Sequence, residues 1–187
     1  MGMNPKIVAI AGGVGGAKLA LGLSHLLPSK QLTVVVNTGD DEEFYGLHVS
    51  PDLDTMMYTL AGVVNQENGW GLADETFNCL SSLNSYGHDT WFKLGDKDLA
   101  THIQRTNLMA SGLSLSEVTL ILSNSLGVLQ RIVPMTDSRV RTMVDTDIGY
   151  LSFQEYFVKF QCEPKVKSIA FNGIEKSSPS PGFVKSL

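Results

Sequence analysis

The chain has 187 residues, of which 43% are hydrophobic and 18% charged, and its formal net charge is −5. This composition is typical of a globular protein with a full core, and it excludes a disordered chain or a small disulfide-bonded scaffold. The acidic balance argues against nucleic-acid binding, which needs a concentrated basic surface. Cys79 and Cys162 form no metal-binding motif, which indicates a reducing cytoplasm. The apolar stretches are of strand length, so we expect no membrane span.

The first 37 residues predict a strand, a glycine-rich turn, a helix and a second strand. Residues 6–11 have the apolar pattern of a buried parallel strand, and glycines dominate residues 12–16. Residues 17–27 predict a helix that ends before Pro28, and residues 32–37 predict the second strand. A right-handed crossover would bring the glycine turn and the end of the second strand to the same carboxyl edge, where open α/β folds bind ligands.

The remaining chain predicts further helices and strands without a repeat or a linker. Ser50 and Asp96 are expected to cap helices, and Ser114 and Ser152 each begin a capping-box pattern. We expect helices at 51–64, 74–83, 96–110 and after Ser114, strands at 131–135, 142–146, 150–153 and 166–171, a short helix after Ser152, and the start of a helix at 181–187. The predicted fold is α/β, with a Rossmann-like parallel sheet, helices on both of its faces and an additional helical and hairpin segment in a single domain, residues 1–187.

Acidic residues are concentrated in one part of the chain. Residues 31–92 contain ten Asp and Glu and no Lys or Arg, and six of the ten fall in two clusters. The clusters are Asp40-Asp41-Glu42-Glu43 and Asp52-Leu53-Asp54. Crowded oxygen ligands suit a hard cation such as Mg²⁺, although solvated loops would have the same composition.

The glycine turn favours phosphate binding over other ligands. Glycines let backbone amides approach a phosphate at a helix N-terminus, although a tight turn without a ligand is the alternative. Lys18 stands where a dinucleotide fingerprint requires glycine, and Asn37 stands where an NAD site places an acid, so an NAD-dependent oxidoreductase is disfavoured. The Gly-Lys-Ser/Thr order of a Walker loop is also absent.

Other polar residues suggest the type of reaction. Asp52 and Asp54 either complement a helix dipole or supply a metal ligand and a base. Lys93 is the first positive charge after the acidic part, and His102 stays a candidate because it lies one helical turn beyond Asp98. No Ser/His/Asp order supplies a covalent nucleophile. These features indicate direct in-line transfer of a phosphoryl group to a bound hydroxyl.

Several ordered motifs strongly resemble the CofD family, the 2-phospho-L-lactate transferases of coenzyme F-420 biosynthesis. The resemblance runs from about Lys6 to the C-terminus. The motifs are Gly12-Gly13-Val14-Gly15-Gly16-Ala17-Lys18-Leu19, Val36-Asn37-Thr38-Gly39-Asp40-Asp41, Val49-Ser50-Pro51-Asp52-Leu53-Asp54-Thr55, Gly69-Trp70-Gly71, Leu94-Gly95-Asp96-Lys97-Asp98-Leu99-Ala100-Thr101-His102 and Pro134-Met135-Thr136-Asp137.

The resemblance implies a Mg²⁺-dependent transfer to the terminal hydroxyl of the deazaflavin Fo. The donor would be a guanosine diphospho-linked phospholactyl or phosphoenolpyruvyl compound, and GMP would be released. An acid of the Ser-Pro-Asp-Leu-Asp segment and the Lys before Leu-Gly-Asp contact the deazaflavin in the family, and they map to Asp54 and Lys93.

Together these considerations give three groups of candidate residues. Asp52 and Asp54 are the catalytic candidates. The metal candidates are Asp40, Asp41, Asp52 and Asp54. The substrate-binding candidates are Asp54, Lys93, Gly12, Gly13, Gly15, Gly16, Lys18 and Asn37.

Family members continue past the position of Leu187, so the resemblance implies that this chain is the N-terminal portion of the family fold and is incomplete at its C-terminal end. We expect small-molecule substrates, neither a nucleic acid nor a membrane as partner, and leave a homodimer open. The alternative function is a non-catalytic, nucleotide-sugar-binding regulator that resembles the gluconeogenesis-factor relatives, because these share a glycine turn on a similar α/β scaffold.

Overall fold

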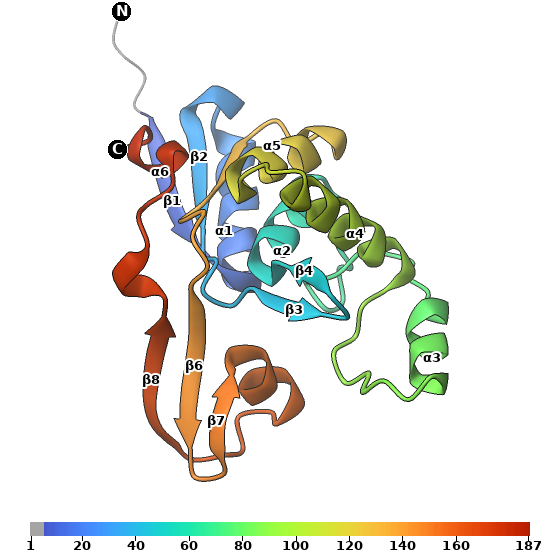
Figure 1. Ribbon diagram of the computed structural model, residues 1–187. Coiled ribbons are helices and arrows are strands. Elements are labelled where there is room, and N and C mark those ends of the chain that lie inside the picture. Colours follow the sequence, from blue (N-terminus) through green and yellow to red (C-terminus); the bar gives the residue numbers. More distant parts are fainter. Residues whose placement is uncertain (1–5) are drawn as a thin grey trace, which may run out of the picture.

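A three-stranded parallel sheet forms the first layer of the computed structural model, which describes residues 6–187. Its strands are β1 (Ile7–Ala11), β2 (Leu32–Val36) and β5 (Arg131–Pro134), in the order β1-β2-β5. Helix α1 (Gly13–Leu26) connects β1 to β2 and completes the expected βαβ unit (Figure 1). The expected fold class, an α/β protein with a parallel sheet, is confirmed.

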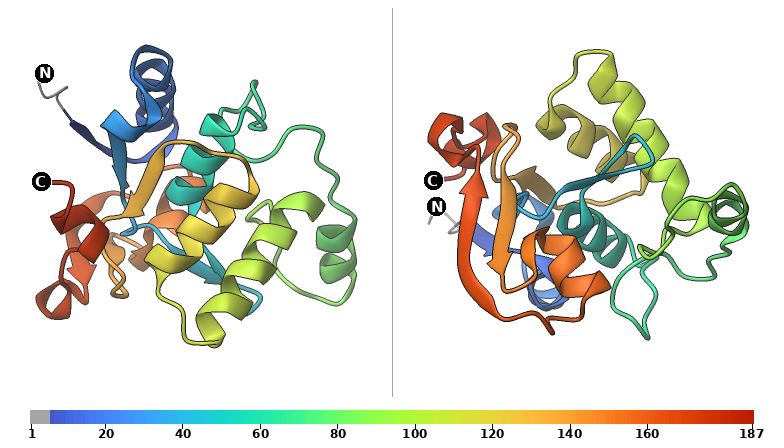
Figure 2. Two further views of the ribbon diagram at one scale, coloured as in Figure 1. Left: turned by 90° about the horizontal axis from the view of Figure 1, so that it is seen from above. Right: turned by 60° about the horizontal axis from the view of Figure 1, so that its bottom comes forward.

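Two smaller antiparallel units follow. The hairpin of β3 (Glu42–Phe44) and β4 (Leu47–Val49) leads from the parallel sheet to the next helix. A second sheet has the order β7-β6-β8, from β6 (Arg141–Thr146), β7 (Gly149–Ser152) and β8 (Val166–Asn172). In Figure 2, β6 and β8 lie side by side along one flank of the molecule.

Five further helices complete the chain. Helices α4 and α5 pack against each other, and α5 also packs on β5. A π-helix, Glu155–Lys159, follows β7. The helices are α2 (Pro51–Leu60), α3 (Asn78–Ser85), α4 (Asp96–Ala110), α5 (Leu115–Ser125) and α6 (Pro181–Val184). No helix within residues 6–187 combines the length and the apolar character needed to cross a membrane.

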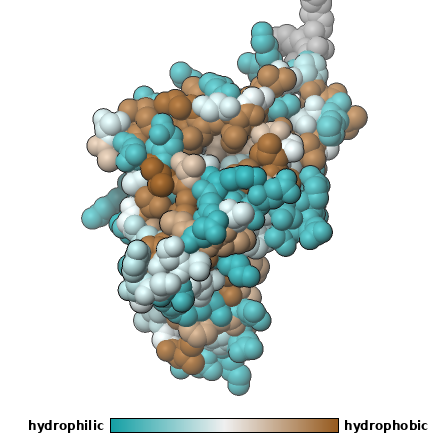
Figure 3. Space-filling view, turned by 90° about the vertical axis from the view of Figure 1, so that its right-hand side faces the viewer, coloured by the Kyte–Doolittle hydropathy of each residue, from teal (hydrophilic) through white to brown (hydrophobic). Residues whose placement is uncertain are grey.

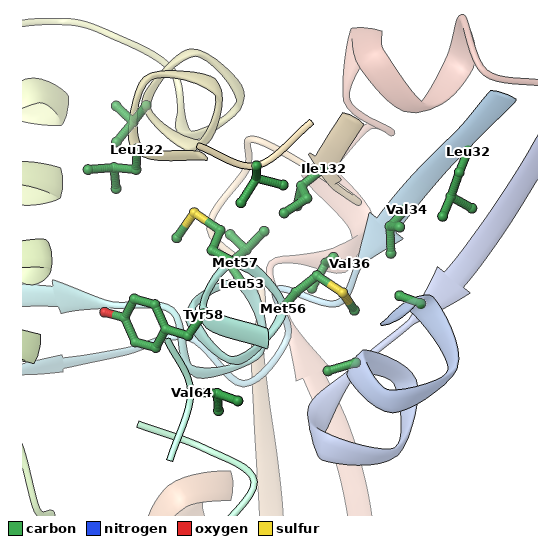
Figure 4. Close-up of a cluster of buried hydrophobic side chains, with 14 of the residues drawn as sticks. Leu32, Val34, Val36, Leu53, Met56, Met57, Tyr58, Val64, Leu122 and Ile132 are labelled. Atoms are coloured by element: carbon green, nitrogen blue, oxygen red, sulfur yellow. The ribbon is translucent and has the colours of Figure 1, made fainter. Parts of the chain in front are cut away.

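The main core lies between the parallel sheet and helices α1, α2 and α5. Alternate residues of β2 point to this face, because side chains alternate along a strand, and Leu53, Met56 and Met57 of α2 pack against them (Figure 4). On the opposite face α6 covers Val133 of β5, whereas Ile10 of β1 is 69% exposed. Helices therefore lie on both faces, but they cover the second face only in part.

Several expected boundaries differ from those in the structure. Helix α1 begins at Gly13 rather than at residue 17, and its first residue has a left-handed φ of +59°, which glycine accepts without strain. Helix α2 ends at Leu60 rather than at residue 64, since Gly62 adopts a left-handed backbone (φ +72°). Asp74 is also left-handed (φ +53°), so α3 begins only at Asn78.

The capping predictions have mixed outcomes. The capping box of Ser114 with Glu117 is confirmed, and Ser152 and Glu155 form the same reciprocal contacts. The prediction that Asp96 caps its own helix is wrong, because the N-cap of α4 is Gly95 and the Asp96 carboxylate instead accepts hydrogen bonds at the start of α3.

Candidate active site

The carboxyl edge of the parallel sheet brings the glycine turn and the acidic loop together, as the βαβ prediction requires. The Asn37 amide nitrogen donates to the Ala11 carbonyl at 3.0 Å, so the ends of β1 and β2 stay side by side beyond the strands. Asn37 then donates through Nδ2 to Asp40 Oδ2 (2.9 Å) and to Asp52 Oδ2 (3.0 Å). One amide group therefore gathers two carboxylates from different segments.

Asp40 and Asp52 are costly to ionise together, because both carboxylates are largely buried and their negative charges repel each other. Burial, and then the charge of Asp52, raise the pKa of Asp40 from 3.8 to about 6. Burial likewise raises the pKa of Asp52, while hydrogen bonds from Asn37 and Gly13 oppose the shift. Both effects disfavour the ionised forms and would be relieved by a cation.

Asp52 lies directly against the glycine turn. A Cβ at Gly12 would come within 2.8 Å of Asp52 Oδ2 and 3.2 Å of Asn37 Cβ, and Gly13 has a left-handed backbone (φ +59°). A Cβ at Gly13 would lie 3.7 Å from Asp52 Oδ1, so both glycines are close to this carboxylate. Part of the amide-rich turn that would attract a phosphate is thus occupied by a carboxylate of the protein itself.

The other glycines of the turn have different surroundings. A Cβ at Gly16 would lie 2.8 Å from the Ala11 side chain, so this glycine permits close packing of α1 on β1. Gly15 has open space around it, and Lys18 is exposed on α1. None of these three residues lines the cavity described below.

Asp41 lies in a separate buried network. Its Oδ2 accepts from the Ser50 hydroxyl (2.9 Å) and lies 3.0 Å from His48 Nε2. Ser50 occupies the N-cap position of α2, but its side chain makes no capping hydrogen bond because it is turned to Asp41. Asp41 therefore stabilises the approach to α2 and does not line the cavity.

Asp54 is buried and paired with Arg105 of α4. Both Arg105 terminal nitrogens contact the carboxylate, Nη1 at 3.1 Å from Oδ2 and Nη2 at Oδ1. Burial raises the pKa of Asp54, and the charge of Arg105 opposes this shift. A bidentate pair of this kind fixes the orientation of the carboxylate.

Asp98 of α4 lies beside this pair and faces the cavity. Its Oδ1 accepts from the Tyr58 hydroxyl at 2.6 Å, and its Oδ2 lies 3.3 Å from His102 Nε2. Burial raises the pKa of Asp98, but the contacts with His102 and Tyr58 outweigh burial and hold it below its usual value. Asp98 is therefore an ionised carboxylate at the cavity wall.

A cavity of about 900 Å³ joins these groups. Of the candidate residues, Gly12, Gly13, Asn37, Asp40, Asp52, Asp54 and Lys93 line it. An aromatic wall also lines it and includes Trp91 and the stacked pair Phe153 and Phe157, whose ring centroids are 5.5 Å apart. A flat apolar group and a charged group could thus be held in one cavity.

The aromatic wall is tied to the acidic loop by Gln154. This residue is buried and donates through Nε2 to the Asp40 carbonyl at 3.1 Å, across 114 positions of sequence. It immediately precedes the π-helix, a rare element that is frequent at functional sites. Sequence reasoning missed Gln154, because a lone glutamine has no spacing that marks its partner.

Several residues of the Leu94 to Asp98 motif take part in helix capping. Asp96 caps α3, while Glu75 accepts from the Lys97 and Asp98 amides at the start of α4. A Cβ at Gly95 would overlap the Glu75 carboxylate, so a larger residue there would displace this cap of α4. This reciprocal capping places Lys93 and Asp98 at the cavity.

The four metal candidates are therefore divided among three surroundings. Asp40 and Asp52 converge on Asn37, Asp41 binds Ser50, and Asp54 binds Arg105. Within residues 6–187, no group of three or more Asp, Glu, His or Cys side chains is placed to hold a metal ion by itself. The Asn37 amide is not a free ligand, because its Nδ2 donates to both carboxylates and its Oδ1 accepts from the Gly39 amide. Asp40 and Asp52 fit Mg²⁺ only if water and substrate phosphates complete the coordination, which is its usual mode in proteins.

Fold and site together define an α/β protein whose ligand cavity opens at the carboxyl edge of a parallel sheet. Sequence comparison identifies the family more narrowly. Residues 7–187 match the model described as 2-phospho-L-lactate transferase CofD, so the chain belongs to the CofD family. The resemblance found from the motifs is confirmed.

Curated relatives come from bacteria and archaea. The chain is 43% identical over 187 residues to a phosphoenolpyruvate transferase of Streptomyces coelicolor, covering 97% of this chain. It is 42% identical over 186 residues to a 2-phospho-L-lactate transferase of Methanopyrus kandleri, covering 99% of this chain. In both cases the match spans 59% of the relative's length.

Solved structures support the fold. A Bacillus halodurans protein of the UPF0052 family superposes with a TM-score of 0.64 at 14% identity, over 98% of this chain and 56% of that one. At this identity the likeness concerns the fold alone.

Proposed function

We propose that this chain carries the acceptor and metal part of a transferase in coenzyme F-420 biosynthesis. A phospholactyl or phosphoenolpyruvyl group would pass from a guanosine diphospho-linked donor to the terminal hydroxyl of Fo, with release of GMP. Support comes from membership of the CofD family and from relatives named for these two transfers. The proposal concerns the whole protein, because the matched region spans 59% of those relatives.

One observation carries the proposal at the level of chemistry. The Asn37 amide holds Asp40 and Asp52 together beside Gly12, in a cavity that is also lined by aromatic side chains. A divalent cation would stabilise the ionised form of Asp40, whose pKa is raised, and it would neutralise part of the charge of the diphosphate. Asp40 and Asp52 are the residues that would hold Mg²⁺, with Asn37 orienting their carboxylates through hydrogen bonds. The aromatic wall suits the flat deazaflavin ring.

Lys93 and Asp54 have distinct parts in this proposal. Lys93 is exposed at the cavity rim, where its ammonium group is available to an anionic or polar ligand. Asp54 is held by Arg105, so any contact that it makes with Fo uses a carboxylate of fixed orientation. Its commitment to Arg105 favours a binding role over that of a general base.

The test is a transfer assay on the purified protein with Fo and each of the two donors, with Mg²⁺ or with excess EDTA. We expect transfer with Mg²⁺ and none in EDTA. Full turnover in EDTA would remove Asp40, Asp41, Asp52 and Asp54 from a metal role. Tight binding of a uridine diphospho-sugar without any response to Fo would instead favour the non-catalytic regulator.

A further inference from the structure

Helix α4 presents three polar side chains in succession to the buried end of the cavity. Asp98, His102 and Arg105 are spaced i, i+4 and i+7, which places them on one helical face. His102 and Arg105 are each 1% exposed, whereas the Asp98 side chain is 15% exposed. Contacts join them in a chain from Asp54 through Arg105 and His102 to Asp98.

Arg105 determines which nitrogen of His102 carries the proton. A guanidinium has only donors and stays protonated in proteins. Its Nη1 lies 3.2 Å from His102 Nδ1, so Nδ1 must be the acceptor. The proton is then on Nε2, which faces Asp98 Oδ2 at 3.3 Å. In a doubly protonated imidazole the Nδ1–H group would face the N–H groups of Arg105 Nη1, so two buried donors would oppose each other. The nearest acceptor for that proton would be Asp54 Oδ2, which lies 3.7 Å from Nδ1, beyond normal hydrogen-bond distance.

The two carboxylates at this end differ in what they can still bind. Asp54 is 6% exposed in its side chain, and both of its oxygens contact Arg105. Asp98 accepts one normal hydrogen bond, from Tyr58, and His102 Nε2 makes none of normal geometry. Because a carboxylate has about four acceptor positions, Asp98 keeps capacity for a ligand.

We propose that Asp98 is a substrate-binding residue that accepts a hydrogen bond from a hydroxyl of a polyhydroxy side chain on the acceptor. Tyr58 and His102 are positioning residues that orient its carboxylate, and Arg105 acts one step further away by fixing the tautomer of His102. This inference rests on the proposed function, in which Fo supplies the hydroxyl-bearing chain.

The tautomer can be tested without any substrate. Long-range ¹H–¹⁵N NMR spectra of ¹⁵N-histidine-labelled protein near neutral pH are expected to show His102 as a neutral imidazole protonated at Nε2. His25, His48 and His88 are internal references, and the loss of one signal in the His102→Gln variant gives the assignment. An imidazolium, or a ring protonated at Nδ1, would overturn the proposed network.

The role of Asp98 is tested by kinetics. Asp98→Asn is expected to lower kcat/KM for the acceptor by about 10- to 100-fold, the loss of a hydrogen bond to a charged group, with the KM for the donor unchanged. Tyr58→Phe is expected to cause a smaller loss of the same kind, because the carboxylate remains but is less well oriented. Asp74→Asn, at an exposed residue, is the matched control.

The outcomes separate this inference from the proposed function. Acceptor kinetics in Asp98→Asn equal to those of the unaltered protein would overturn the inference and leave the proposed function intact. An unaltered protein that neither binds nor uses a deazaflavin would overturn the proposed function and, with it, the substrate role of Asp98. The NMR result would still decide the proton position of His102.

Discussion

Two pairs of carboxylates lie in the same cavity, and they are compensated in opposite ways. At the α4 end, Asp54 and Asp98 are accompanied by the cation of Arg105 and by the donors Tyr58 and His102. At the glycine turn, Asp40 and Asp52 are joined by the neutral amide of Asn37. The charges of the first pair are compensated within the protein, so this end can offer the preorganised Asp98 carboxylate to a neutral hydroxyl. The second pair retains a cost that a cation from solution would remove, so the two ends suit ligands of different charge.

Breaking the compensated pair is expected to have the largest effect. Arg105→Met leaves Asp54 buried without its partner, so we expect the free energy of unfolding to fall by about 3–5 kcal/mol. The measurement is urea unfolding followed by circular dichroism. Combining Arg105→Met with Asp54→Asn should restore part of the loss, because the uncompensated charge is then absent.

Arg139→Met is the matched control for this experiment, because Arg139 is exposed. We expect it to change stability by less than about 0.5 kcal/mol. Equal effects of the two arginine variants would contradict the assignment of Arg105 to a buried ion pair.

Magnesium is expected to stabilise the uncompensated end. A cation that binds only the folded state adds about 2.7 kcal/mol when its concentration is 100 times its Kd. Mg²⁺ should therefore raise Tm in a thermal unfolding experiment, relative to NaCl of equal ionic strength. Asp52→Asn should reduce this rise, whereas the exposed Asp74→Asn should retain it. The same rise in Asp52→Asn would place the ion elsewhere.

The raised pKa of Asp40 gives a prediction about pH. Its value is about 6 in the folded protein and 3.8 in the unfolded chain, so the folded state holds the extra proton between these values. Stability then decreases as pH rises from about 4 to about 6, and stays lower above that range. Asp40→Asn removes this loss, and we expect it to be more stable than the original protein by about 1 kcal/mol at pH 7, after allowance for solvent screening.

The control is the same comparison at pH 4, without Mg²⁺, where the two proteins should have nearly equal Tm values. A stability advantage of Asp40→Asn that is independent of pH would show that the Asp40 charge is not its cause.

The sequence is sufficient to predict the part of the site that depends on strand ends. Parallel strands place their carboxyl ends at one edge, so the proximity of Gly12 and Asn37 follows from the βαβ pattern, whereas Asp52 reaches them only because α2 packs beside this edge. Figure 3 shows hydrophobic residues exposed among hydrophilic ones on one side of the molecule. The sequence does not predict which apolar residues are exposed, because single ones such as Phe77 and Ile103 occur at the surface of many proteins.

The contacts that complete the site depend on long-range packing. Asp54 meets Arg105 across 51 positions and Asp40 meets Gln154 across 114, and no local spacing links these residues. The sequence gives only a weak indication of Arg105: its spacing places it on the same helical face as Asp98 and His102. The count of acidic residues alone could not show that the charge of Asp54 is balanced by an arginine, whereas Asp40 is bound by the neutral amide of Asn37.

The smallest expected effect concerns an exposed ion pair next to Trp91, a residue of the cavity lining, and it gives a reference for the buried charges. Lys159 Nζ lies 2.8 Å from Asp89 Oδ2 and 5.5 Å from the centroid of the Trp91 ring, and the two charged side chains are 33% and 67% exposed. Exposed pairs contribute little, because water and salt screen them and both side chains lose freedom. Lys159→Met should therefore change stability by at most about 0.5 kcal/mol in urea unfolding, and less in high salt. A loss comparable with that of Arg105→Met would show that burial is not what distinguishes the charges of this cavity.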